Sequence, residues 1–143
     1  MTETVILKLG GSVITDKSGD GAIDRARLHE IAGQLAARGA AALVLVHGAG
    51  SCGHPEARRY RINKGLTGKN VPGVYYTHAA VVRLNAAVVE ALRDAGIEAI
   101  GIHPLDLALT EDGRLVSLET RHIAEMTEHG IVPVLHGDVV MDR

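Results

Sequence analysis

Two short apolar runs, each leading directly into a glycine-rich stretch, constrain the fold of this chain most. Residues 5–9 precede Gly10-Gly11, and residues 42–46 lead into the stretch from Val46 to Pro55. Residues 24–39, between the runs, have the apolar spacing of a helix. Strand, helix and strand in this order favour two parallel strands, whose carboxyl ends meet at one edge of a sheet. We therefore expect both glycine stretches to face a single crevice.

The rest of the chain continues this alternation of strands and helices. Asp24 can cap the first helix and Gly39 can end it, with apolar side chains at Leu28, Ile31, Ala32 and Leu35. Further along we expect a helix from His78 to Ala95 capped by Thr77, strands at 97–102 and 131–135, an extended piece at 114–118 and a helix at 119–129. The expected fold class is α/β, a mostly parallel sheet with helices on both faces, formed by one domain over residues 1–143.

Composition excludes several classes of protein. Hydrophobic residues make up 46% and charged residues 22%, which favours a folded globular domain over a disordered chain. Phe and Trp are absent, so Val, Leu, Ile and Ala must fill the core, as is typical of buried parallel strands. A net charge of −2 gives no reason to expect nucleic acid or membrane partners, and a single cysteine excludes an internal disulfide. Without a signal peptide or an apolar run of ~20 residues, we expect a cytoplasmic protein.

The glycine stretches predict an anion site. Gly48, Gly50 and Gly53 leave room for backbone N–H groups to approach one oxyanion, although a tight turn between strand and helix also favours glycine. Lys8, inside an apolar strand, is costly to bury unless it meets an anion at the strand's end. The alternative is an edge-strand lysine that faces water.

Two further patterns concern the ligand. No acidic residue occurs between Glu56 and Glu90, whereas this segment carries six basic residues, Arg58, Arg59, Arg61, Lys64, Lys69 and Arg83. Such a segment either raises the local concentration of a phosphorylated ligand or is simply solvated. In the expected helix 78–95, Val82, Ala86 and Val89 form a second apolar stripe, which faces an apolar ligand, a partner subunit or the core.

The segment Gly48 to Gly53 also matches G-x-G-x-x-G, the pattern of dinucleotide-binding folds. Such a site needs an acidic residue about 20 positions later for the ribose hydroxyls, and the sequence has none there. An NAD-dependent oxidoreductase is therefore a weak alternative. A Walker A loop is excluded because His54 stands where lysine is required.

Several motifs together carry a resemblance to a known family. They are Lys8-Leu9-Gly10-Gly11-Ser12 with Thr15-Asp16-Lys17, the loop from His47 to Pro55, Thr77-His78, Gly101-Ile102-His103-Pro104, and Pro133-Val134 with Gly137-Asp138. In this set the chain resembles the isopentenyl phosphate kinases of the amino acid kinase superfamily, and the loop ending in Gly53-His54 is shared with the related fosfomycin kinases. The resemblance implies transfer of the γ-phosphoryl group of ATP to isopentenyl phosphate, a step of isoprenoid synthesis by an alternative mevalonate route.

The resemblance also assigns roles to residues. It places Lys8 and Lys17 at the ATP phosphates and the transferring group, with Lys8, Lys17 and His54 as the catalytic residues. The phosphates of ATP are implied to contact Lys8, Leu9, Gly10, Gly11, Ser12 and Gly50, and the acceptor phosphate is implied to contact Ala49, His54 and Gly137. ATP, Mg²⁺, a small phosphorylated isoprenoid and a homodimer are the implied cofactors and partners.

The chain departs from that family in two respects. Cys52 stands where the family usually has Phe, which affects packing under the loop or beside the prenyl tail. Family members are also longer, and this chain corresponds to their N-terminal, acceptor-binding half, without the half that carries the adenine pocket and the Mg²⁺-associated acidic residue. The alternatives are therefore a fragment, one subunit of a split enzyme with a separately encoded C-terminal half, a non-catalytic binding or dimerisation lobe, or a fosfomycin-type small phosphonate kinase.

Overall fold

The computed structural model describes residues 3–16, 18 and 21–143, so the predictions for Lys17 lie outside the described residues. In chain order the elements are β1 Val5–Leu9, α1 Gly11–Ile14, α2 Arg25–Arg38, β2 Leu43–His47, α3 Gly50–Tyr60, a 3₁₀ turn Ile62–Lys64, α4 Pro72–Asp94, β3 Ala99–Ile102, α5 Pro104–Leu107, β4 Ala108–Glu111, β5 Arg114–Leu118, α6 Arg121–Glu128, β6 Val132–His136 and β7 Met141–Asp142. The expected α/β class is confirmed.

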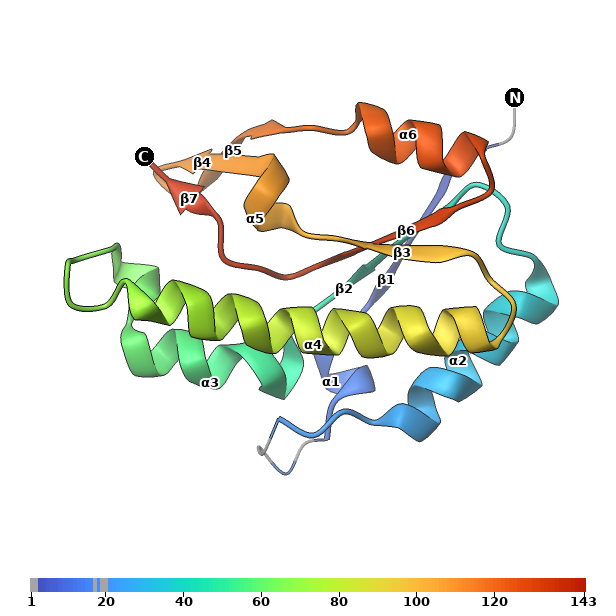
Figure 1. Cartoon of the computed structure of the whole chain (residues 1–143), viewed down its shortest axis with the longest axis horizontal. Coiled ribbons are helices and arrows are strands. Elements are labelled where there is room, and N and C mark those ends of the chain that lie inside the picture. Colours follow the sequence, from blue (N-terminus) through green and yellow to red (C-terminus); the bar gives the residue numbers. More distant parts are fainter. Residues whose placement is uncertain (1–2, 17, 19–20) are drawn as a thin grey trace.

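The centre of the fold is a sheet of four parallel strands in the order β1-β2-β6-β3. Figure 1 shows α2 and α4 on one side of this sheet and α6 on the other. Because every strand of this sheet runs the same way, the carboxyl ends of all four strands lie at one edge. The expected convergence of the segments that follow β1 and β2 is therefore confirmed at the level of topology.

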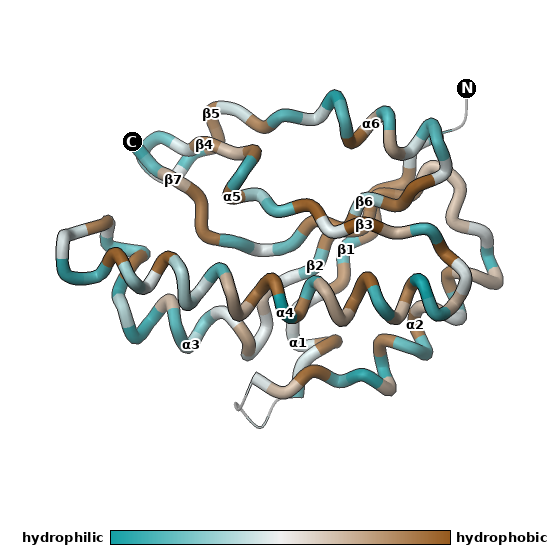
Figure 2. Tube along the Cα trace, in the orientation of Figure 1, coloured by the Kyte–Doolittle hydropathy of each residue, from teal (hydrophilic) through white to brown (hydrophobic). Residues whose placement is uncertain are grey.

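Alternate side chains of the central strands enter two separate cores. Leu45 and Val134 are fully buried against Leu84 of α4, in the larger core that α2 and α4 complete. Val44 faces the other way and packs with Ile123 of α6 in a smaller core. Figure 2 accordingly shows apolar residues concentrated in these central strands. Burial on both faces explains why β2 and β6 are almost continuously apolar rather than alternating.

Helix α2 forms where its sequence signals predicted. The Asp24 carboxylate accepts a hydrogen bond from the Arg27 N–H at 2.9 Å, and Gly39 ends the helix with a φ of 83°. Leu28 and Ala32 are buried on the face that meets α4. The cap and the apolar spacing were therefore sufficient to predict where α2 forms.

The start of α4 was predicted wrongly. The helix begins at Pro72 instead of after Thr77, and Thr77 is buried inside it. Proline fits the first helical turn because its missing N–H would have no partner there. Gly73 follows, and a Cβ on it would collide with the Tyr60 side chain, so this glycine allows α4 to pack on α3. Although α4 has 23 residues, no helix in the described part of the chain is long and apolar enough to cross a membrane.

The glycine-rich stretch 46–55 was expected to be a loop, and half of it is helical. Helix α3 begins at Gly50 and contains Pro55 in its second turn. Pro55 lies past the first turn, so its missing N–H leaves the Ser51 carbonyl without its intrahelical donor, and α3 has one bond fewer at this point. The loop proper is therefore reduced to Gly48 and Ala49, between β2 and α3.

A second, smaller sheet of order β5-β4-β7 lies beyond α5. The extended piece 114–118 was expected and is β5, whereas β4 and β7 were not predicted. Strands β4 and β5 form an antiparallel hairpin whose turn residues Asp112 and Gly113 have φ values of 49° and 73°. Positive φ at both turn positions matches the twist of a hairpin, which explains the Asp-Gly pair.

Candidate functional site

A cavity of about 600 Å³ lies where the two glycine stretches meet, at the carboxyl ends of β1 and β2. Its lining comes from α1 with the segment after it, and from the start of α3. The lining residues are Gly11, Ser12, Thr15, Asp16, Gly48, Ala49, Gly50, Ser51, His54, Pro55 and Arg58. Of the residues predicted to bind an anion, Gly11, Ser12, Gly48, Ala49, Gly50 and His54 line this cavity, whereas Lys8, Leu9, Gly10, Gly53 and Gly137 are not in its lining.

Backbone contacts between the two stretches require glycine. A Cβ on Gly48 would lie 2.7 Å from the Gly11 nitrogen, and a Cβ on Gly11 would collide with the Gly50 backbone. Gly50 also has a positive φ of 53° and no space for a side chain beside Thr15. These glycines let two chain segments touch, so their N–H groups border one small volume.

Hydrogen bonds from Thr15 and Ser51 join the segment after α1 to the start of α3. The buried Thr15 hydroxyl donates to the Gly11 carbonyl at 2.8 Å and accepts from the Ser51 N–H at 3.2 Å. The Ser51 hydroxyl donates to the Asp16 carbonyl at 3.1 Å. The sequence analysis gave Thr15 and Ser51 no such role, because a tertiary contact between two loops leaves no periodic signal.

The start of α3 supplies positive potential to the cavity. Ala49 caps the helix, Gly50 is its first residue, and His54 and Arg58 lie one and two turns further on. The dipole of a helix N-terminus attracts anions even though the Ser51 N–H is already bonded to Thr15, and both side chains add donors on the same helix face. An anion at this position would therefore meet backbone donors, the His54 imidazole and the Arg58 guanidinium.

Gly137, at the end of β6, borders the same site. Its N–H donates to the His47 carbonyl at 2.8 Å, and a Cβ on Gly137 would lie 3.4 Å from the Ala49 nitrogen. The structure thus places Gly137 beside Ala49, while Ala49 and His54 line one cavity. The three residues implied to hold the acceptor phosphate are neighbours.

The residues implied to contact ATP are less closely grouped. Gly10 caps α1, Ser12 lines the cavity, and Leu9 packs against the larger core while its carbonyl accepts from the Gly48 N–H at 3.0 Å. Lys8 is exposed on the edge strand β1, outside the cavity lining, and makes no hydrogen bond or ion pair within the described residues. Its role at a phosphate stays a prediction.

A buried polar network beneath the site was not foreseen. His47 ends β2 and His136 ends β6, and both side chains are buried. Asn85 of α4 donates to His47 Nε2 at 3.1 Å, and His103 Nδ1 lies 2.8 Å from His136 Nε2. Burial lowers the pKa of His47 to about 4 and also lowers the pKa of His136. The sequence signal that could have indicated this network is a histidine directly before a glycine at the end of each strand, in His47-Gly48 and His136-Gly137.

Asp138 belongs to the same network, and its carboxylate turns inward. One oxygen lies 2.8 Å from His78 Nδ1, and the other accepts from the Leu105 N–H at 3.2 Å. The carboxylate is fully buried and therefore needs these partners. Its charge is paired with His78 rather than presented to the cavity.

A second cavity, of about 640 Å³, adjoins the site on the side of α3 and the small sheet. Its lining is largely apolar and includes Ala57, Ile62, Leu66, Val74, Val139, Val140 and Met141. Ala57 is three residues after His54, and Val139 is two residues after Gly137, so this cavity is lined by residues close in sequence to the first site, although the two cavities share no lining residue. The stripe Val82, Ala86 and Val89 does not line this cavity. Val89 packs against the larger core, and Ala86 lines a different groove with Arg25 and Glu90.

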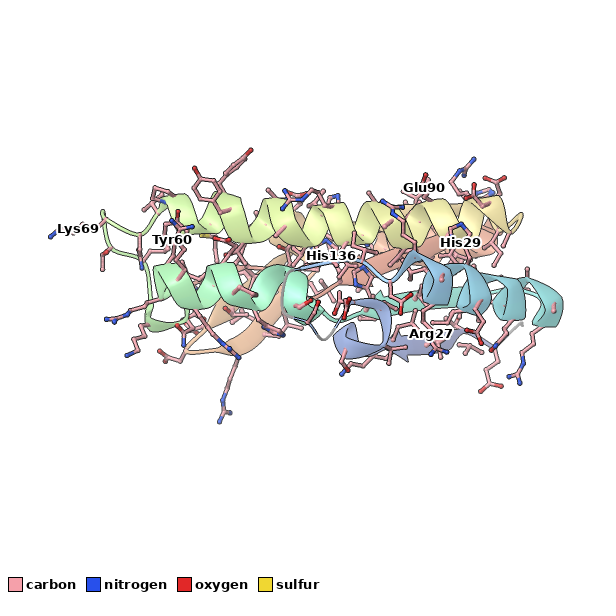
Figure 3. The ribbon with its side chains drawn as sticks, turned by 90° about the horizontal axis from the view of Figure 1, so that it is seen from below. Arg27, His29, Tyr60, Lys69, Glu90 and His136 are labelled. Atoms are coloured by element: carbon pink, nitrogen blue, oxygen red, sulfur yellow. The ribbon has the colours of Figure 1, made fainter. Side chains whose placement is uncertain are left out.

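Figure 3 views the molecule from the side of the helices. Glu90 of α4 and His29 of α2 lie near each other at the contact between these helices, where Arg25 pairs with Glu90 at 3.0 Å and His29 with Asp94 at 3.3 Å. Tyr60 and Lys69 lie near the opposite end, and His136 lies in the middle of the molecule. The polar network is therefore internal, whereas the pairs between α2 and α4 are exposed.

Comparison with known proteins assigns the class. The model of the amino acid kinase family matches residues 3–143, and the chain belongs to that family. The isopentenyl phosphate kinase of Methanothermobacter thermautotrophicus is 40% identical over 96% of this chain and 54% of its own length. The isopentenyl phosphate kinase of Haloferax volcanii is 39% identical over 95% of this chain and 55% of its own length.

Solved structures agree with this assignment. An isopentenyl phosphate kinase crystal structure superimposes with a TM-score of 0.91 at 39% identity, covering 98% of this chain and 59% of that one. A product complex of the Thermoplasma acidophilum isopentenyl phosphate kinase gives a TM-score of 0.83 at 31% identity, covering 97% and 57%. The chain thus spans about half the length of the relatives it matches, as the resemblance implied.

Proposed function

We propose that this chain supplies the acceptor-phosphate site of a kinase that transfers the γ-phosphoryl group of ATP to isopentenyl phosphate. The observation that carries the proposal is the contact between the glycines of two strand ends around one cavity, with His54 and Arg58 on the adjoining helix. The amino acid kinase family and relatives named isopentenyl phosphate kinase support the choice of reaction and acceptor.

In the proposed reaction, the acceptor phosphate binds to the Ala49 N–H and His54 and lies against Gly137, where the absence of a side chain leaves room for it. One of its oxygens, already anionic, attacks the γ-phosphorus of ATP. A new P–O bond forms as the bond from the γ-phosphorus to the β,γ-bridging oxygen breaks, giving isopentenyl diphosphate and ADP. No general base is needed, so the residues act by positioning and by stabilising charge. We assign to Lys8 and Lys17 the role of stabilising the negative charge on the ATP phosphates and the transferring phosphoryl group.

We place the isoprenoid part of the acceptor in the apolar cavity next to the phosphate site. Its walls at Ile62, Leu66 and Val140 bury hydrocarbon favourably, and it opens beside the residues that follow His54 and Gly137. This placement differs from the stripe at Val82, Ala86 and Val89, which faces the core and a charged groove.

The described residues offer no ready-made protein cage for Mg²⁺, which in kinases is held largely by the phosphates of the nucleotide. Within residues 3–16, 18 and 21–143 no group of three or more His, Cys, Asp or Glu side chains could hold a metal ion. The buried Asp138 carboxylate is paired with His78, and Asp16 is the acidic residue in the cavity lining. We therefore derive no step from a metal held by this chain.

A second candidate function is that of a binding lobe, either non-catalytic or one subunit of a split enzyme. It is favoured by the extent of the match, which covers 54% and 55% of two relatives' lengths. An ADP-release assay with isopentenyl phosphate separates these functions if it is run on the 143-residue chain alone and on the chain extended by any coding sequence that follows. Activity only in the extended protein supports the kinase. Binding without activity in both supports the lobe, and turnover of fosfomycin instead would favour a phosphonate kinase.

A further inference from the structure

His47 and His136 occupy equivalent places at the ends of neighbouring strands. They are direct register partners of the parallel pair β2 and β6, and each is followed by a glycine. Their rings stack with centroids 5.7 Å apart and planes inclined by 23°. The side chains expose only 1% and 3% of their surface, so their ring nitrogens depend on partners inside the protein.

The hydrogen bonds at Nδ1 determine the tautomer of both rings. His47 Nδ1 lies 2.9 Å from the Gly48 carbonyl oxygen, and His136 Nδ1 lies 3.0 Å from the Gly137 carbonyl oxygen. A carbonyl oxygen only accepts, so Nδ1 must carry the proton in both rings. In a neutral ring, Nε2 is then an acceptor.

The partners at Nε2 agree with this tautomer. The Asn85 amide, a donor, points one N–H at His47 Nε2 and a second at the Val134 carbonyl, each at 3.1 Å. His103 Nδ1 donates to His136 Nε2 at 2.8 Å. The nearest carboxylate, Asp138, lies 3.9 Å from His136 Nε2 and is bonded to His78. Both rings are therefore fixed at both nitrogens.

These bonds also set the direction of the next peptide groups. A trans peptide is planar, and its C=O and N–H point in opposite directions. With the Gly48 carbonyl held by the His47 ring, the Ala49 N–H points away from that ring. The same relation at Gly137 directs the Asp138 N–H away from His136. Within the described residues, neither N–H has a protein acceptor, and the Ala49 nitrogen borders Gly137.

We propose that His47 and His136 are positioning residues of the acceptor-phosphate site, which hold the Gly48 and Gly137 carbonyls so that the Ala49 and Asp138 N–H groups are directed at the bound phosphate. Asn85 and His103 fix the two rings, and Gly101 leaves the space for Asn85, since a Cβ there would collide with its amide oxygen. The inference rests on the proposed function for the identity of the acceptor. The orientation of the peptides requires only an anion at the site.

The first test uses the unaltered chain labelled with ¹⁵N. Ring-nitrogen NMR should show His47 and His136 as neutral tautomers protonated at Nδ1. Addition of isopentenyl phosphate, and separately of inorganic phosphate, should shift the amide signals of Ala49 and Asp138. Protonation at Nε2 in either ring, or amide signals that ignore both anions, would overturn the proposal. If inorganic phosphate shifts these amides and isopentenyl phosphate does not, the proposed acceptor fails while the positioning role stands.

The second test compares two substitutions of His136. In His136→Asn, the side-chain amide can replace Nδ1 as donor to Gly137, so the affinity for isopentenyl phosphate should stay within about threefold of the unaltered chain. His136→Leu removes the donor and should weaken binding about tenfold or more, the scale of one lost hydrogen bond in such a site. His129→Leu, at an exposed position after α6, serves as the control and should change nothing.

Equal affinity for isopentenyl phosphate in folded His136→Leu and His136→Asn would contradict the positioning role. If His136→Leu fails to fold, the tautomer and amide measurements on the unaltered chain decide the matter by themselves. In an enzyme that turns over, His136→Leu should raise KM for the acceptor and leave KM for ATP unchanged, a split that general destabilisation would not produce.

Discussion

The ends of β2 and β6 differ from the end of β1, although all three carry glycines at the same edge of the sheet. Strands β2 and β6 end in the buried residues His47 and His136, and buried Asn85 of α4 is hydrogen-bonded to His47. β1 is an edge strand, and its Lys8 is exposed and makes no hydrogen bond or ion pair within the described residues. The side proposed for the acceptor is thus preorganised, whereas the side proposed for the transferring group is open. Preorganised donors favour specific binding of one anion, because little ordering is needed on binding.

The largest expected effect concerns the open side. Lys8→Met keeps the length of the side chain and removes its charge, so kcat of the enzyme containing this chain should fall by about 10²–10³, the scale for losing one donor to a developing charge. Binding of isopentenyl phosphate should change much less, because Lys8 lies outside the cavity lining. Steady-state kinetics and calorimetry would measure both. Near-normal kcat would mean that Lys8 is an ordinary edge-strand lysine.

Burial of His47 should make the free energy of unfolding depend on pH. The pKa of His47 is about 4 in the folded chain, below its ordinary value of 6.5, because burial disfavours the charged ring. Between these two pKa values the unfolded chain binds more protons at His47 than the folded chain does. The contribution of neutral His47 to the free energy of unfolding is therefore complete above pH 6.5 and is lost as pH falls towards 4. The shift corresponds to about 3 kcal/mol.

Urea unfolding at a series of pH values would measure this slope. His47→Asn keeps a donor to the Gly48 carbonyl and removes the titrating ring, so it should flatten the pH dependence between 6.5 and 4. An equally steep slope in that variant would assign the effect to another group, such as His136, whose pKa is also lowered by burial.

His54 lies on exposed helix surface at the cavity. His54→Ala removes a charged hydrogen bond to the acceptor phosphate worth about 1.5–3 kcal/mol, so kcat/KM should fall about tenfold to a hundredfold or more. Because the side chain is exposed, the unfolding midpoint should hardly move. Unchanged kinetics with isopentenyl phosphate would remove His54 from the site.

The smallest expected effect separates two helical glycines. A Cβ on Gly53 would lie 2.5 Å from a Val81 methyl carbon, so Gly53→Ala should destabilise the chain by about 1–3 kcal/mol through overpacking. In the control Gly33→Ala, the new methyl group on α2 meets nothing within 4 Å and should stabilise by roughly 0.5–1 kcal/mol. Urea unfolding would compare them. Equal shifts would show that α3 and α4 adjust to the methyl group without strain.

Sequence patterns predicted the elements whose causes are local. The Asp24 cap, the apolar spacing of α2 and the apolar strands 43–47 and 132–136 all act within a few residues, and each was found close to its expected place. The start of α4 was missed because proline and glycine, here Pro72 and Gly73, are typical of loops, whereas Gly73 is needed for the contact with Tyr60. Strand β4 was missed because the short sequence Ala108–Glu111 has no clear strand pattern, and pairing with β5 is what stabilises it as a strand.

The candidate site also contains residues that local sequence signals predicted and residues that depend on long-range contacts. The glycines were predicted from their spacing and His54 from the family resemblance, and Gly11, Gly48, Gly50 and His54 line one cavity. The network of His47, Asn85 and His136 was not predicted, since it depends on which side chains meet across β2, β6 and α4. Long-range contacts of this kind have no periodic sequence signal, although a histidine before each glycine was visible.

If the proposed acceptor-phosphate site is built within these 143 residues, the isolated chain should bind the acceptor by itself. An NMR titration of the ¹⁵N-labelled chain with isopentenyl phosphate, with ADP release followed in parallel, would measure this. We predict weak saturable binding that shifts the Ala49, Gly50 and Asp138 amides, is reduced in His54→Ala, and occurs without turnover of ATP. Binding that shifts other residues, or no binding at all in the folded chain, would contradict the proposal.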